Sequence, residues 1–161
     1  YRSSRGLGDV YKRQFETFGR GRNFASRYQR LGEAAGGVKL GCSLYEVAPG
    51  KRAFPFHAHH GTEEAIFILA GEGTLRLGDG EHVVGAGTYA AFPPGADAAH
   101  QLINTGTTTL RYLCLSSKAD PDVVTYPDSG KTLASAGGDS GVRIMARFVN
   151  NLGYWDGEDV G

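Results

Sequence analysis

Short runs of β-branched and aromatic residues, separated by glycine and proline, most limit how this chain can fold. No window keeps a helical period of apolar residues for long, whereas short runs between turn residues are typical of strands. Many short strands at close spacing form a sandwich or a barrel. The pattern therefore predicts an all-β protein. We expect strands at residues 38–47, 52–59, 64–69, 74–77, 82–84, 89–92, 100–103, 109–116 and 123–126.

The length and composition of the chain fit one soluble domain. It has 161 residues, 40% of them hydrophobic, which is enough for a core of its own. No apolar run reaches the ~18 residues of a membrane helix, and no secretory segment opens the chain, so we expect a cytoplasmic protein with no membrane partner. The basic cluster between Arg20 and Arg30 has no matching aromatic ladder, so we expect no nucleic-acid partner either.

The two ends of the chain are predicted to lie outside the barrel. Residues 1–14 end in DVYKRQ, which resembles the translation of a transposon end used as a sequencing adaptor, so we expect a non-native scar there. Residues 15–36 then form a lead-in segment. Residues 128–141 contain TLASAGGDSG, which favours a flexible linker. Residues 142–161 form an extension whose secondary structure stays open and whose aromatic residues predict docking on the barrel or on a second subunit.

Three of the five histidines lie in the stretch FHAHHGTEEA at residues 56–65. Residues two apart on a strand share a face, so His57 and His59 point one way and His60 points the other. Two imidazoles on one face are the beginning of a metal site. A carboxylate ligand is available next to them, but the turn between the strands hides the register, and parity alone does not choose between Glu63 and Glu64.

The spacing of these residues resembles the two cupin motifs. The first run is GKRAFPFHAHHGTEEAIFILAG at residues 50–71, and the second is GTYAAFPPGADAAHQLIN at residues 87–104. The likeness implies a double-stranded β-helix (jelly-roll) cupin barrel over residues 37–127. It also selects Glu64, because the family's glutamate precedes the motif glycine, here Gly71, by seven positions. Two more residues than usual separate Gly95 from His100.

The resemblance implies one divalent metal ion, held by His57, His59, Glu64 and His100. Three imidazoles and one carboxylate do not choose among iron, manganese, nickel, zinc and copper. Such an ion leaves positions open for oxygen, water or a small organic molecule.

The function implied is that of a small-molecule metalloenzyme, of the dioxygenase or of the isomerase or decarboxylase type. The alternatives are a non-catalytic module that binds a small ligand, or a sensor. Parity with the ligands places Ile66, Ile68 and Leu102 on the barrel wall. Tyr45 and Tyr112 are candidate catalytic residues inside the barrel.

A second copy of the chain is the macromolecular partner that we expect. Phe54, Phe56, Phe67 and Leu69 are predicted to face outward from the barrel. Such an apolar set is poorly suited to water, so it predicts a homodimer.

Overall fold

The computed structural model describes residues 14–147 and 152–159 of the chain. The predicted scar therefore lies outside the described residues, except for Gln14. Almost all elements are strands, and a single turn of α-helix and three short 3-10 turns (η) interrupt them. The elements are β1 Glu16–Arg20, β2 Phe24–Arg30, α1 Leu31–Ala34, β3 Leu40–Val47, β4 Ala58–His59, β5 Glu64–Ala70, β6 Glu72–Leu77, β7 Gly80–Gly85, β8 Tyr89–Phe92, η1 Ala96–Ala98, β9 His100–Ile103, β10 Leu110–Ser117, β11 Asp122–Tyr126, η2 Pro127–Ser129, β12 Lys131–Ala136, η3 Gly138–Ser140 and β13 Val142–Ala146.

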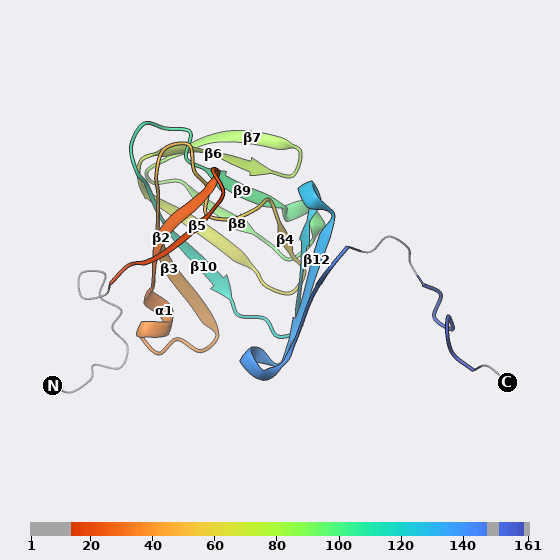
Figure 1. Cartoon of the computed structure of the whole chain (residues 1–161). Coiled ribbons are helices and arrows are strands. Elements are labelled where there is room, and N and C mark those ends of the chain that lie inside the picture. The colour runs from red at the N-terminus through yellow and green to blue at the C-terminus, as the bar shows by residue number, and fades with distance from the viewer. Residues whose placement is uncertain (1–13, 148–151, 160–161) are drawn as a thin grey trace.

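These strands form three antiparallel sheets. The largest has the order β1-β2-β3-β10-β5-β8, the second has the order β13-β12-β11-β4, and the third has the order β7-β6-β9. Strands far apart in sequence are neighbours in the first two sheets, as β3 beside β10 and β4 beside β11 show. In Figure 1, β2, β3, β5 and β10 are labelled on one side of the molecule and β12 on the other, with β4 between them.

The core lies between the sheets and is mostly aliphatic. Ile68 and Leu110 are fully buried there, together with Val47 and Phe92. One buried polar residue, Asn104, ties the loops at one end of the barrel. Its amide donates to the carbonyls of Val47 and Thr108 at 2.7 and 2.8 Å, and its oxygen accepts from the backbone N–H of Gly106 at 3.0 Å. A buried amide with its donors and acceptor satisfied stabilises this arrangement.

The predicted strands agree well with the structure, with one main exception. Strands 89–92 and 100–103 are confirmed at both ends. The predicted strand 52–59 is wrong over most of its length, because only Ala58–His59 forms a strand. Pro55 lies inside the run and has no N–H to donate to a ladder. Arg52 and His57 make isolated bridges on either side of it.

The segments flanking the predicted barrel contain strands that the sequence did not indicate. The lead-in at 15–36 holds β1, β2 and α1, and β2 extends the large sheet by pairing with β3. The prediction of a linker at 128–141 is wrong for Lys131–Ala136, which forms β12. That strand is held on both sides, by β11 and by β13. Backbone pairing of this kind orders even a run of small residues. The extension from 142 begins as β13, and residues 148–151 and 160–161 lie outside the described part.

The predicted outward apolar set is confirmed for Phe67 and Leu69, which are exposed. Phe54 is exposed as well but also lines a cavity of the barrel, and Phe56 is only 6% exposed. Because residues 53–57 leave strand geometry, their alternation is lost, and the Phe56 ring packs under the guanidinium of Arg76 at 4.2 Å. Among the described residues, no helix has the length and apolar character to cross a membrane.

Candidate metal centre

Four side chains from three parts of the chain converge on one point. His59 closes β4, Glu64 opens β5, and His100 opens β9, while His57 precedes β4 and forms a bridge with His100. The Nε2 atoms of His57, His59 and His100 lie 3.5, 3.5 and 3.3 Å from the same oxygen, Oε2 of Glu64. The ligand atoms of His57, His59 and Glu64 all lie within 4.8 Å of one another.

The other ring nitrogen of each histidine already has a hydrogen-bond partner. Nδ1 lies 2.8 Å from the carbonyl of Pro55 in His57, 2.5 Å from Oδ2 of Asp122 in His59, and 3.0 Å from the carbonyl of Ala98 in His100. All three partners are acceptors, so each Nδ1 carries the proton and a neutral ring has its lone pair on Nε2.

This donor set fits a divalent metal ion. Three imidazole lone pairs and one carboxylate oxygen face a common point, and atoms that all carry negative charge or lone pairs are stabilised by a cation between them. Hydrogen bonds from Nδ1 to fixed acceptors are the usual support of metal-binding histidines. Within the described residues, the arrangement is thus compatible with a metal held by His57, His59 and Glu64, with His100 beside them.

The carboxyl group of Glu64 is held in its charged form. Burial alone would raise its pKa, but the three imidazoles of His100, His57 and His59 around the carboxylate outweigh burial, and the pKa of Glu64 lies well below its usual range. A charged carboxylate surrounded by imidazoles is the state that a cation requires.

The neighbouring candidates lie away from this point. His60 is exposed and its Nε2 contacts the Thr125 hydroxyl at 3.2 Å. Glu63 and His82 are exposed as well. The structure thus separates Glu64 from Glu63, a choice that strand parity left open.

The long arc before His100 does not carry His100 away from the other ligands. The extra residues fold into the 3-10 turn η1, Ala96–Ala98, and the last carbonyl of that turn is the acceptor for His100 Nδ1. The Phe92 ring stacks on the imidazole of His100 with centroids 3.6 Å apart and planes 5° apart. His100 is therefore fixed on one edge and one face.

A cavity of about 300 Å³ opens beside the four side chains. Most of its wall is apolar, and Gln101, Tyr112, Cys114 and Tyr126 add polar atoms. Of the residues predicted to line the barrel, Ile66 and Leu102 do so and Ile68 lies in the core instead. The full lining is Phe54, Pro55, His57, His59, Glu64, Ile66, Leu75, His100, Gln101, Leu102, Tyr112, Cys114, Val124, Tyr126 and Leu133.

The two candidate tyrosines have different positions. Tyr112 lines the cavity, whereas Tyr45 lies behind it, stacked between the rings of Tyr28 and Tyr112 at centroid distances of 5.5 and 5.4 Å. Burial raises the pKa of both phenols. Both phenols are therefore protonated near neutral pH, and the ring of Tyr45 packs against the ring of Tyr112.

The sequence did not identify Asp122, Phe92 or Gln101 as site residues. Asp122 contacts His59 across 63 positions of sequence. Phe92 and Gln101 lie inside the second run that resembles a cupin motif, next to His100 in space or in sequence. Their proximity to His100 was the only available signal, whereas no local pattern relates Asp122 to a histidine in another strand.

Comparisons with known proteins agree with this architecture. Residues 43–116 match the family described as Cupin domain. A candidate sugar phosphate isomerase from Acidithiobacillus ferrooxidans has 29% sequence identity and a TM-score of 0.74, covering 88% of this chain and 93% of its own. A sugar phosphate isomerase of the cupin superfamily from Silicibacter pomeroyi has 25% identity and a TM-score of 0.70, covering 84% and 80%. A predicted oxalate decarboxylase from Thermotoga maritima shares the fold at 23% identity and a TM-score of 0.61, covering 69% and 97%. No curated protein matches the chain.

The class of protein follows from fold and site together. Residues 43–116, fewer than half of the chain, resemble the Cupin domain family, and the chain has an all-β, double-stranded β-helix fold like that of its structural neighbours, so the predicted fold class is confirmed. Its His57, His59 and Glu64 group is compatible with metal binding.

Proposed function

We propose that this protein is a metal-dependent cupin isomerase that acts on a small α-hydroxy carbonyl compound of the sugar phosphate class. The observation that carries the proposal is the convergence of three histidine Nε2 atoms on one Glu64 oxygen beside a cavity of about 300 Å³. Similarity to two proteins named for sugar phosphate isomerisation favours this type over a dioxygenase or a decarboxylase.

In this proposal the four predicted ligands, His57, His59, Glu64 and His100, hold one divalent ion. When bound, the ion supplies Lewis-acid polarisation of a substrate oxygen. Tyr112 keeps its phenolic proton because burial raises its pKa, so its hydroxyl is suited to donate a hydrogen bond to a second substrate oxygen. Isomerisation then removes a proton from the hydroxyl-bearing carbon and adds one to the neighbouring carbonyl carbon, while the hydroxyl proton passes to the former carbonyl oxygen, with no net oxidation.

The cavity restricts the part of the substrate that can reach the centre. Its volume is at the lower end of the range for small-molecule sites. Among the described residues that line it, none is a lysine or arginine. The hydroxy carbonyl end therefore enters the cavity, where Ile66, Leu75 and Leu102 exclude water, and a phosphate group remains at the mouth.

One observation favours a second candidate, a non-catalytic module that binds a small ligand. Among the described residues that line the cavity, Glu64 is the one with a carboxylate, and this carboxylate faces the three histidines. An isomerase needs a group that accepts the carbon-bound proton. A module that only binds its ligand needs no proton-accepting group.

Metal content tests the ligand assignment first. Protein purified without chelators is expected to hold about one metal ion per chain, and His59→Ala and Glu64→Ala are expected to lose it. His60→Ala and Glu63→Ala are matched controls, because each makes the same substitution at the adjacent exposed residue of the same type. Full occupancy in His59→Ala or Glu64→Ala would overturn the assignment.

Proton exchange then tests the reaction. In deuterium oxide, an isomerase incorporates deuterium at the carbon that gains the proton, and NMR with a panel of short aldose and ketose phosphates detects this. Oxygen uptake by iron-loaded protein with catechols, thiols or β-diketones would instead indicate a dioxygenase. Tight binding of a panel compound without exchange would favour the binding module.

A further inference from the structure

We infer that Asp122 is the positioning residue that makes His59 a metal ligand. The inference rests on the proposed metal site but not on the proposed reaction. Asp122 opens β11, outside the segment that matches the Cupin domain family. The Oδ2 atom of Asp122 lies 2.5 Å from Nδ1 of His59, and Asp122 is only 8% exposed.

The backbone fixes Asp122 relative to His59. Strand β11 pairs with β4 so that Val124 lies opposite His59. The N–H of His60 donates to the carbonyl of Val123 at 2.8 Å. Because the carboxylate is shielded from water and bonded to an imidazole, its hydrogen bond is stronger than a neutral one. It holds the His59 proton on Nδ1 and leaves the lone pair of Nε2 toward Glu64.

The second oxygen of Asp122 fixes the turn between two of the ligands. Its Oδ1 accepts from the backbone N–H groups of Gly61 and Thr62 at 2.8 and 3.3 Å. A Cβ at position 61 would lie 3.1 Å from this oxygen and 3.0 Å from the Pro121 carbonyl, so only glycine allows the turn to come this close without a shift. One carboxylate thus orients His59 and sets the path of the chain from His59 to Glu64.

The substitution Asp122→Asn separates these two roles. A carboxamide has one acceptor oxygen and one NH₂ donor. If the oxygen keeps the bonds to Gly61 and Thr62, the NH₂ faces Nδ1 of His59, which must then accept. The His59 proton moves to Nε2, where it blocks the lone pair. In the opposite orientation, the NH₂ group would face the backbone N–H groups of Gly61 and Thr62. Because all of these groups are donors, both hydrogen bonds to the turn would be lost.

Two measurements test the inference on the full chain. Cobalt(II) titration, followed by calorimetry and by the visible spectrum, gives the metal affinity. Loss of such a partner weakens metal binding by roughly 10–100-fold, so we expect a loss in this range for Asp122→Asn. Nitrogen-15 NMR of the metal-free protein reports the His59 tautomer, which we expect to be Nδ1–H in the wild type and Nε2–H in the variant.

Glu46→Gln is the matched control. Glu46 has a side chain that is only 13% exposed and is paired with Arg27 and Arg111, far in the fold from the four histidine and glutamate ligands. We expect wild-type cobalt affinity in this variant.

Three results would overturn the inference. The first is cobalt binding by Asp122→Asn within about threefold of the wild type, well short of the expected 10–100-fold. The second is weaker binding with an unchanged His59 tautomer, since Asp122 would then act only through the fold. The third is an Nε2–H tautomer in the wild-type protein, which needs no variant to observe. None of these readouts depends on isomerase activity, so failure of the proposed reaction leaves them interpretable.

Discussion

Among the glycines of the two runs that resemble cupin motifs, Gly71 is the one whose replacement by alanine should destabilise the barrel most. Gly71 joins β5, which begins with Glu64, to β6, and its φ is +85°. A Cβ there would lie 2.7 Å from the carbonyl oxygen of Thr109 and 2.9 Å from the Cα of Leu110. Both are backbone atoms of the loop and strand next to β5, so neither can move aside as the tip of a flexible side chain can.

The expected cost has three parts. A left-handed backbone costs an L-residue about 1–2 kcal/mol, and forcing a methyl group into a packed site costs typically about 1–3 kcal/mol. Alanine also loses less chain entropy on folding than glycine, which returns about 0.4–1 kcal/mol. Together these parts give a net loss in free energy of unfolding of about 1–5 kcal/mol for Gly71→Ala, with a middle value of about 3 kcal/mol. For a chain of 161 residues the middle value lowers Tm by roughly 6–12 °C.

Gly87→Ala is the control that isolates the close contact. Gly87 has a φ of +88°, but a Cβ there meets nothing within 4 Å. It carries the backbone cost without the packing cost, so we expect a loss of about 1 kcal/mol. Urea titration and thermal unfolding of both variants measure the difference. If Gly71→Ala is no more destabilising than Gly87→Ala, the close approach to Thr109 and Leu110 does not limit position 71.

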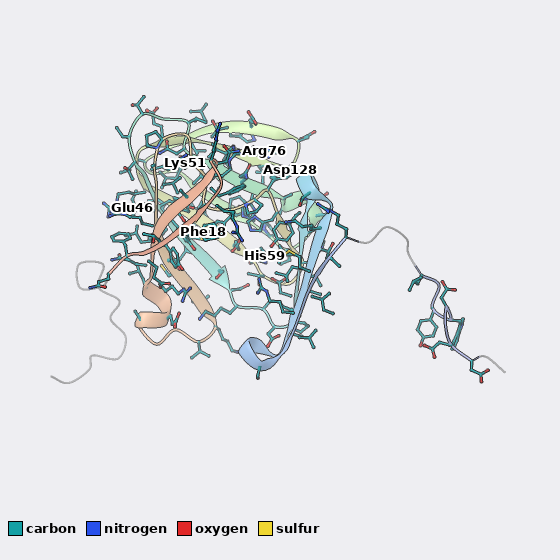
Figure 2. All side chains as sticks on the ribbon, viewed as in Figure 1. Phe18, Glu46, Lys51, His59, Arg76 and Asp128 are labelled. Atoms are coloured by element: carbon teal, nitrogen blue, oxygen red, sulfur yellow. The ribbon has the colours of Figure 1, made fainter. Side chains whose placement is uncertain are left out.

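Three further predictions concern the metal, one ion pair and the assembly. Removing metal with a chelator should lower Tm by roughly 5–10 °C when the starting metal is at 100 times its Kd, because such binding adds about 2.7 kcal/mol; Glu64→Ala should show no chelator shift in differential scanning calorimetry. The bidentate pair of Arg76 and Asp128, which lie side by side in Figure 2, is exposed, so Asp128→Asn should cost no more than about 1 kcal/mol. The hydrogen bond from Arg76 lowers the pKa of Asp128. The stability that the pair contributes should therefore be fully present above the unfolded-state pKa of about 3.9 and should disappear as pH falls through the lower folded-state pKa. A difference in stability between wild type and Asp128→Asn that is the same at all pH values in urea titrations would contradict this prediction. We also predict that the chain is a homodimer through the outer face of β5, where Phe67 and Leu69 are 36% and 41% exposed, and that Leu69→Glu gives a monomer in sedimentation velocity; a monomeric wild type at micromolar concentration would refute this.

The bounds of a strand could be predicted where turn residues mark both ends of a run. Strand β8 lies between Gly87 and Pro93, and its predicted and observed bounds agree. Strand β12 could not be predicted, because KTLASA has few of the residues that favour strands by themselves. Its order comes from β11 and β13 on either side, and pairing between segments is not encoded within the segment itself.

The candidate metal ligands were selected from sequence in two ways. Strand parity groups His57 with His59, whereas Glu64 and His100 come from the resemblance to the cupin motifs, in which the glutamate precedes the motif glycine, here Gly71, by seven positions. The parity argument assumed a strand through both histidines, whereas only His59 lies in one and His57 is held by a bridge to His100. An alternating backbone over three residues was sufficient for both side chains to share a face.

Some residues that line the cavity lie outside the segment that contains the candidate ligands. All four predicted ligands lie within residues 43–116, the segment that matches the Cupin domain family. Val124, Tyr126 and Leu133, which line the cavity, lie beyond it on β11 and β12. In Figure 2 the His59 side chain lies between the six-stranded sheet and the hairpin of β11 and β12. The matched segment therefore contains all four candidate ligands, while the hairpin of β11 and β12 contacts His59 and forms part of the cavity wall. Substitutions in the hairpin should alter substrate choice and metal affinity, whereas substitution of His57, His59, Glu64 or His100 should remove the centre altogether.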